Sequence, residues 1–296
     1  MEIAYWVVGG VLALFYLYAG GMKLTRSKDR LRPMMAWVDA MPFPQPFRAG
    51  MAVQFKFERH SWGGFLFGRQ YEGALWYYQP VAVLVKTPLG MLAMWLAGVA
   101  ALLGVRRLRP AAPYLLLPPA VLFAATLFES RNFGTRYVIF LPMFLAVAAA
   151  TVAAVRWRWV PALVTALVLF VAVSSLHTFP YYIPYSNEAF GGPSKTYLRL
   201  HDSNSDWGQD LGRVAELIHT KYPGEPVWLA YQGGADPRWY GFDSPDATSV
   251  PAARVRGLLV VSNDRIDKST ARLRFLMATS TKLAEVGHSM TVFRRP

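Results

Sequence analysis

The sequence predicts a mainly α-helical membrane protein, with about five transmembrane helices and a small extracytoplasmic α/β domain. Three observations lead to this fold class. Of the 296 residues, 54% are apolar and only 17% are charged, whereas an ordinary soluble domain carries about 25% charged residues. The apolar residues form long uncharged stretches, and the basic residues gather beside those stretches.

Five uncharged stretches of 17 to 19 residues have the length that a membrane helix needs, because about 20 helical residues cross the hydrocarbon core. They are Ala4–Met22, Leu89–Val105, Pro110–Phe128, Tyr137–Val155 and Trp159–Leu176. The alternative is five buried helices of a large soluble protein. A half-exposed helix of a soluble protein would carry a polar stripe, and none of the stretches shows one.

The net charge of +13 is concentrated in the apolar part of the chain. Residues 1–177 hold 17 of the 31 Lys and Arg and 6 of the 18 Asp and Glu. Three clusters, at 23–32, 106–109 and 156–158, lie next to uncharged stretches, which is the positive-inside pattern of a membrane protein. This pattern places the chain after His177 outside the cytoplasm. We therefore expect membrane lipid as a partner and no nucleic acid.

The chain contains no cysteine. This excludes a disulfide scaffold, a thiolate nucleophile and any metal site with cysteine ligands.

Residues 1–41 carry a group of short aromatic, glycine and basic motifs. These motifs are Tyr5–Trp6, Gly20–Gly21, Lys23–Leu24–Thr25 and Met35–Ala36–Trp37–Val38. They resemble the start of a DoxX-like membrane protein, whose family forms a small bundle of transmembrane helices. The resemblance implies that residues 1–41 are an N-terminal transmembrane helix followed by a basic loop.

Two strings distinguish the rest of the chain: Lys86–Thr87–Pro88, and the nine residues DSNSDWGQD from Asp202 to Asp210. With the intervening Tyr, Gly and Pro motifs they resemble the C-terminal half of bacterial glycosyltransferase family 39 proteins, the protein-mannosyltransferase-like group. The resemblance implies a partial GT-C-like membrane domain over 42–180, with an external loop at 42–85. An extracytoplasmic α/β domain would follow over 181–296.

Enzymes of this family take a sugar from a polyprenyl-phosphate carrier and attach it to a protein, lipid or glycan acceptor outside the cytoplasm. The resemblance therefore implies a multi-pass protein of the bacterial inner membrane, with a lipid-linked sugar and an acceptor as partners. The chain has no counterpart of the family's N-terminal catalytic acidic loop, so we expect an incomplete transferase. The alternative is a non-enzymatic DoxX-like membrane protein or scaffold.

Three basic residues are candidates for binding a lipid phosphate, and one carboxylate is a weak candidate for catalysis. Lys86 lies beside a predicted helix N-terminus at headgroup depth, where a phosphate can bind; alternatively it is an interfacial lysine that reaches toward water. Arg131 and Arg136 share a short predicted external loop with Glu129. An arginine there can hold a phosphate with two hydrogen bonds. Glu129 is a weak candidate base, and a local ion pair is its alternative.

The acidic string and the earlier Asn187 form the candidate external motif, and its residues can contact an acceptor. The motif comprises Asn187, Asp202, Asn204, Asp206, Trp207, Gln209 and Asp210. Its spacing partly follows a calcium-binding loop, but Trp207 replaces the required glycine and Arg213 replaces the final glutamate. Two interpretations of the string remain: a looser divalent-metal site, or a turn in which Asp206 or Asp210 caps a following helix. No cofactor is firmly implied.

The last part of the chain has the pattern of an α/β fold. Apolar and β-branched runs predict strands at Val227–Tyr231, Gly257–Ser262 and Met290–Phe293. Amphipathic spacing predicts helices at 209–222 and 266–279.

Overall fold

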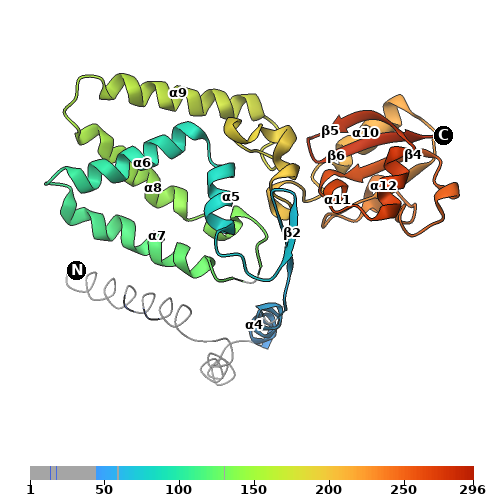
Figure 1. Ribbon diagram of the computed structural model, residues 1–296, viewed down its shortest axis with the longest axis horizontal. Helices are drawn as coiled ribbons and strands as arrows, with labels where there is room; N and C mark the ends of the chain where they lie inside the picture. The colour runs from blue at the N-terminus through green and yellow to red at the C-terminus, as the bar shows by residue number, and fades with distance from the viewer. Residues whose placement is uncertain (1–13, 15–17, 19–44, 59, 130) are drawn as a thin grey trace.

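The computed structural model describes Leu14, Tyr18 and residues 45–58, 60–129 and 131–296. A helical part precedes an α/β part in the chain, and the two lie side by side (Figure 1). The predicted DoxX-like helix and the first uncharged stretch fall outside the described residues, except for Leu14 and Tyr18.

From residue 45 onward, the helical part contains α4 (Gln45–Glu58) and a short antiparallel hairpin of β1 (Gly63–Leu66) and β2 (Arg69–Glu72). Five helices follow, which are α5 (Tyr78–Lys86), α6 (Leu89–Gly104), α7 (Ala112–Thr126), α8 (Leu141–Ala150) and α9 (Val160–Thr178).

Helix α6 packs closely against two neighbours through glycines. A side chain at Gly98 would overlap the backbone of Ala148 and Ala149 at the end of α8. A side chain at Gly90 would come within 2.9 Å of the carbonyl oxygen of Leu167 in α9. The glycines therefore set the close approach of these helices.

The prediction of about five transmembrane helices in a partial GT-C-like bundle is wrong. Within the described residues, only α9 is both long enough and apolar enough to cross a membrane. Helices α5 and α6 pass the same test only if a pair bent by 116° is counted as one span. A multi-pass location in a bacterial inner membrane is accordingly not supported.

Three of the uncharged stretches, Leu89–Val105, Pro110–Phe128 and Tyr137–Val155, fail as single spans because the helices in them are short or interrupted. Helix α6 has 16 residues and α7 has 15, and α7 also contains Pro118 and Pro119. The stretch Tyr137–Val155 divides into α8, of only 10 residues, with a 3₁₀ turn on each side. At 1.5 Å per residue, these helices extend about 15–24 Å, less than the roughly 30 Å of a hydrocarbon core.

The α/β part contains a four-stranded sheet in the order β3 (Val227–Ala230), β4 (Gly257–Ser262), β6 (Met290–Arg295) and β5 (Thr281–Val286). Strands β3 and β4 are parallel, and the other two pairings are antiparallel.

Alternate residues of β4 face two separate cores, as the period of two in a strand requires. Leu258 and Val260 pack with α10 (Leu211–Lys221). Leu259 and Val261 pack with α12 (Ala271–Ala278). The sheet is therefore buried on both sides of its central strand.

The three predicted strands are confirmed as β3, β4 and β6, and the predicted helix at 209–222 is confirmed as α10. The predicted helix at 266–279 is instead two helices, α11 (Asn263–Asp267) and α12, because the chain breaks between them. Strand β5 was not predicted. It lies at the edge of the sheet with its side chains partly or fully exposed, so its sequence lacks a buried apolar run.

Candidate functional site

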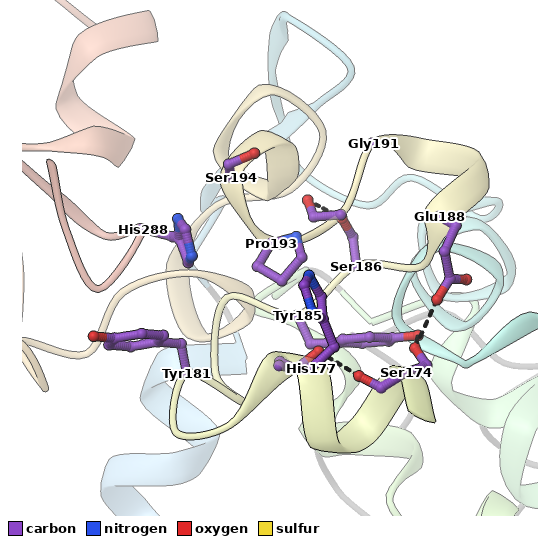
Figure 2. Close-up of a pocket in the computed structure, with 12 residues that line it drawn as sticks. Ser174, His177, Tyr181, Tyr185, Ser186, Glu188, Gly191, Pro193, Ser194 and His288 are labelled. Atoms are coloured by element: carbon purple, nitrogen blue, oxygen red, sulfur yellow. Dashed lines mark hydrogen bonds between the residues drawn. The ribbon is translucent and has the colours of Figure 1, made fainter. Parts of the chain in front are cut away.

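A half-open cavity of about 460 Å³, lined by both polar and apolar surface, lies at the C-terminal end of α9 (Figure 2). The last turns of α9 and the segment 181–194 that follows them contribute to it, together with the distant turn between β5 and β6. Its lining residues are Ser174, His177, Thr178, Tyr181, Tyr185, Ser186, Glu188, Gly191, Gly192, Pro193, Ser194 and His288.

One wall of the cavity is a hydrogen-bonded set of hydroxyl groups and a carboxylate. The Ser174 hydroxyl donates to Oε1 of Glu188 at 2.7 Å, and its oxygen lies 3.2 Å from that of Tyr185. The Thr178 hydroxyl donates to the carbonyl oxygen of Ser174 at 2.8 Å. Burial raises the pKa of the Tyr185 phenol, with Glu188 adding to the effect, so this ring stays neutral at physiological pH.

The opposite wall is formed by two rings, one from each part of the protein (Figure 2). Tyr181 and His288 meet edge to face with their ring centroids 5.4 Å apart. The guanidinium of Arg213 lies 5.1 Å from the centroid of the Tyr181 ring. The β5–β6 turn therefore brings the α/β part to the end of α9.

The segment between the two walls is held by its own polar contacts. The Ser186 hydroxyl donates to the carbonyl oxygen of Gly192 at 2.7 Å. Oδ1 of Asn187 accepts the backbone N–H of Ala189 at 3.2 Å, which starts the 3₁₀ turn containing Glu188. Gly191 ends that turn at a φ of 94°, a conformation that favours glycine. Glu188 is thus placed by local structure rather than by a long helix.

Two predicted site residues connect α5 to the segment that follows α9. The partly buried Lys86 ammonium donates to the carbonyl oxygens of Ile183 and Asn204, each at 2.6 Å. The Asn187 amide donates to the carbonyl oxygens of Leu84 and Thr87 at 2.7 and 2.8 Å. These carbonyls become available because the chain bends between α5 and α6.

The acidic string lies where the helical and α/β parts meet. The Asn204 amide donates to the hydroxyl of Tyr78 in α5 at 2.9 Å. On the other side, Asp264 accepts the backbone N–H of Asp202 at 2.8 Å and the hydroxyl of Ser205 at 2.5 Å. The string therefore connects α5 to the N-terminal end of α11.

Asp210 occupies the predicted N-cap position of α10, but its side chain makes no capping hydrogen bond to the helix. Asp210 accepts the Ser289 hydroxyl at 2.6 Å and pairs with Arg213 at 2.5 Å, which links the start of α10 to β6. Oδ1 of Asp206 accepts the backbone N–H of Gly208 at 2.7 Å. The Gln209 side chain accepts the backbone N–H of Trp207 at 2.7 Å.

Burial dominates the titration of two carboxyl groups in this region. Asp264 is 1% exposed, and burial raises its pKa to about 7, against the opposing effect of the Ser205 hydrogen bond. Burial raises the pKa of Asp206 to about 6. Both groups favour the protonated form in the folded protein more than in the unfolded chain.

The loop after α7 carries the remaining predicted residues, Glu129, Arg131 and Arg136. Arg131 lies 3.4 Å from the amide oxygen of Gln54 in α4. Arg136 contacts aromatic rings, including that of Trp207. The backbone N–H of Glu129 bonds to the carbonyl oxygen of Thr126 at the end of α7. The structure thus brings both basic residues to the acidic string, Arg136 through the ring of Trp207 and Lys86 through the carbonyl oxygen of Asn204.

In the part of the chain that the structure describes, no group of three or more His, Asp or Glu side chains is arranged to hold a metal ion. No cofactor is positively indicated.

The sequence did not single out Ser174, Glu188 or His288 as site residues. Glu188 had a signal, since it directly follows Asn187 in the motif segment. Ser174 and His288 had none, because only the fold brings these positions, more than 100 residues apart, to one cavity. No family model, curated protein or solved structure matches this chain.

Proposed function

We propose that this protein is a membrane-bound, glycosyltransferase-like protein that binds the head of a polyprenyl-phosphate-linked sugar in the cavity at the end of α9. The observation that carries the proposal is the form of α9. It is apolar over 19 residues, yet only 11% of its most apolar segment is buried, and it ends at a cavity that several polar side chains line. A helix in the core of a soluble protein would be mostly buried.

A lipid-linked sugar needs an apolar surface for its lipid chain next to a surface with hydrogen-bonding groups for its head. Its polyprenyl chain requires an apolar environment, which the exposed sides of α9 and the surrounding lipid supply. Its sugar and phosphate require hydrogen-bonding groups, which Ser174, Tyr185 and Glu188 supply. Tyr181 adds an aromatic face against which a sugar ring can stack.

The residues before α9 support an orientation for this helix. Arg156 and Arg158 alternate with Trp157 and Trp159 directly before it. Basic residues favour the cytoplasmic side, and tryptophans favour the membrane–water interface. We place the cavity and the α/β part on the extracytoplasmic side, with α9 as the membrane helix of a bacterial inner-membrane protein.

The cavity suits transfer of a sugar to a hydroxyl acceptor of a protein, lipid or glycan. The acceptor oxygen would attack the anomeric carbon. The bond from that carbon to the phosphate oxygen would break, and the electron pair would leave with the polyprenyl phosphate. The acceptor proton would pass to a carboxylate, for which Glu188 is the candidate in this cavity. His177 and His288, when protonated, would stabilise the phosphate charge.

The proposal predicts separate effects on binding and on transfer. With a radiolabelled polyprenyl-phosphate hexose in lipid nanodiscs, we expect His177→Ala to weaken binding at least tenfold through loss of a phosphate contact. We expect Glu188→Gln to keep binding while transfer to water or an added acceptor falls at least 100-fold. Glu216→Gln, on the exposed side of α10, is the matched control.

Thermal unfolding should show that the wild type and His177→Ala are both folded. Equal binding of the donor by the two folded proteins would refute the cavity as the donor site.

Running the assay with EDTA and with added Mg²⁺ tests the metal interpretation of the acidic string. Loss of transfer in EDTA, restored by Mg²⁺, would support it.

A second candidate function is a non-enzymatic scaffold. It is favoured by Lys86, Asn187 and Asn204, whose polar atoms all bond within the chain and join its segments. Donor binding with no transfer in the wild type would support this second function.

A further inference from the structure

Arg136 lies among three aromatic rings on the surface. Its guanidinium carbon is 5.7, 5.1 and 5.4 Å from the ring centroids of Phe133, Tyr137 and Trp207. Two of the rings belong to its own loop, and Trp207 comes from the acidic string 70 residues later. Such cation–π contacts hold the guanidinium plane in place while leaving its edge open.

Both central side chains of this cluster are accessible to a ligand. Arg136 is exposed, and Trp207 is 49% exposed. One guanidinium nitrogen donates to the Tyr137 hydroxyl at 3.3 Å. Among the residues with described positions, no carboxylate lies within ion-pair distance of Arg136. The remaining N–H donors therefore have no anionic partner there.

The two loops that carry Arg136 and Trp207 are fixed to each other. The backbone N–H of Thr135 donates to Oδ1 of Asn204 at 3.2 Å, and the Ser203 hydroxyl donates to the carbonyl oxygen of Phe133. Gly134, at a φ of 123°, has no room for a side chain because Ser203 lies against it. The arginine and the indole are thus held in position before any ligand arrives.

We propose that Arg136 and Trp207 form a binding site for an anionic sugar, separate from the cavity at the end of α9. The exposed indole face offers a stacking surface for a sugar ring. The guanidinium offers paired N–H donors for a phosphate or carboxylate on that sugar. A preorganised pair binds more tightly because little conformational freedom is lost on binding. The ligand class is therefore a sugar phosphate or a uronic-acid sugar.

The chain contains a matched control for this site. Arg158 lies 5.0 Å from the ring centroid of Trp159, and both side chains are exposed. These two residues are neighbours in sequence, and no second loop fixes them. The pair has the same chemistry without the arrangement on which the proposal rests.

The test is ligand-observed NMR and calorimetry on the full chain in nanodiscs. The probes are glucose 1-phosphate, a galacturonic acid oligomer and the neutral maltotriose. We expect at least one anionic probe to bind, with maltotriose at least tenfold weaker. Arg136→Gln and Trp207→Ala should each weaken that binding at least tenfold, while Trp207→Phe should retain most of it. Arg158→Gln should bind like the wild type.

The comparison of the two anionic probes shows whether phosphate or carboxylate is preferred. His177→Ala should leave binding at Arg136 intact, which separates this site from the donor cavity. The proposal is overturned if neither anionic probe binds, if maltotriose binds equally well, or if Arg136→Gln and Arg158→Gln behave alike.

Discussion

Replacing Gly98 by alanine is expected to destabilise the helical part by about 2 to 3 kcal/mol. The new methyl group would overlap the carbonyl oxygen of Ala148 and the backbone of Ala149. Backbone atoms cannot rotate away as a flexible side chain can, so α6 and the end of α8 would have to separate. The contact is further held by the Thr151 hydroxyl, which donates to the carbonyl oxygen of Gly98 at 2.8 Å.

Thermal unfolding of the purified protein measures this effect, and Gly104→Ala is the matched control in the same helix. A methyl group at Gly104 would meet no atom within 4 Å. Alanine is also the better helix former. We expect the midpoint of Gly98→Ala to fall by several degrees and that of Gly104→Ala to stay or rise. Equal midpoints for the two variants would contradict the described packing of α6 on α8.

Asp264→Asn is expected to become more stable relative to the wild type as the pH rises from about 4 to 7. Burial raises the pKa of Asp264 to about 7 in the folded protein, and the charge of Lys268 opposes this effect. In the unfolded chain an aspartate has a pKa of about 4. Between these values the folded wild type holds a proton that the unfolded chain has released, so its stability falls as the pH rises.

The variant carries no ionisable group at this position, so it does not lose that stability. The difference between the two proteins should change by on the order of 3 to 4 kcal/mol across this pH range, at 1.36 kcal/mol per pKa unit. An asparagine can keep both contacts, since its oxygen can accept the N–H of Asp202 and its amide can donate to the Ser205 hydroxyl.

Other groups in the region also titrate, so the comparison with the variant is more informative than the wild type alone. The raised pKa of Asp206, about 6, acts in the same direction. Burial lowers the pKa of His201 to about 3, which makes stability rise with pH between about 3 and 6.5. The His201 effect is common to the wild type and the variant, whereas the charges of Asp206 and Asp264 act on each other, so part of the Asp206 effect is included in the measured difference.

Denaturant unfolding at pH 4.5, 6 and 7.5 provides the measurement, with the exposed Asp243→Asn as control. Asp243→Asn should follow the wild type at every pH. Parallel stability curves for Asp264→Asn and the wild type would show that burial does not govern this carboxyl group.

The sequence predicted the α/β part better than the helical part for a physical reason. The core of the sheet depends on alternating apolar residues in β4 and on the amphipathic face of α10, and both patterns are local. The length of an apolar helix depends instead on where it breaks. The Lys86–Thr87–Pro88 string marks the sharp bend between α5 and α6, but the end of α8 in a 3₁₀ turn has no comparable signal.

The candidate site was predicted only in part, because its residues meet through tertiary structure. The string from Asp202 to Asp210 was recognised as a unit, but its contacts with Tyr78, Asp264 and Ser289 depend on three distant segments. These contacts explain the short polar side chains of Asn204, Ser205 and Asp210, whereas Gly208 is required by its φ of 84° and by the Tyr231 side chain against it. Local spacing suggested metal binding or helix capping, and neither requires those partners.

Photocrosslinking tests the central claim most directly. A polyprenyl-phosphate sugar with a photoreactive group on the sugar is incorporated with the protein into nanodiscs, irradiated, and mapped by mass spectrometry. The account predicts labelled residues within 174–194 and at His288, with labelling prevented by excess unlabelled donor. Two results would contradict the claim that the cavity at the end of α9 receives the donor. One is labelling that excess unlabelled donor prevents but that lies only in other segments, and the other is labelling that the unlabelled donor does not prevent anywhere.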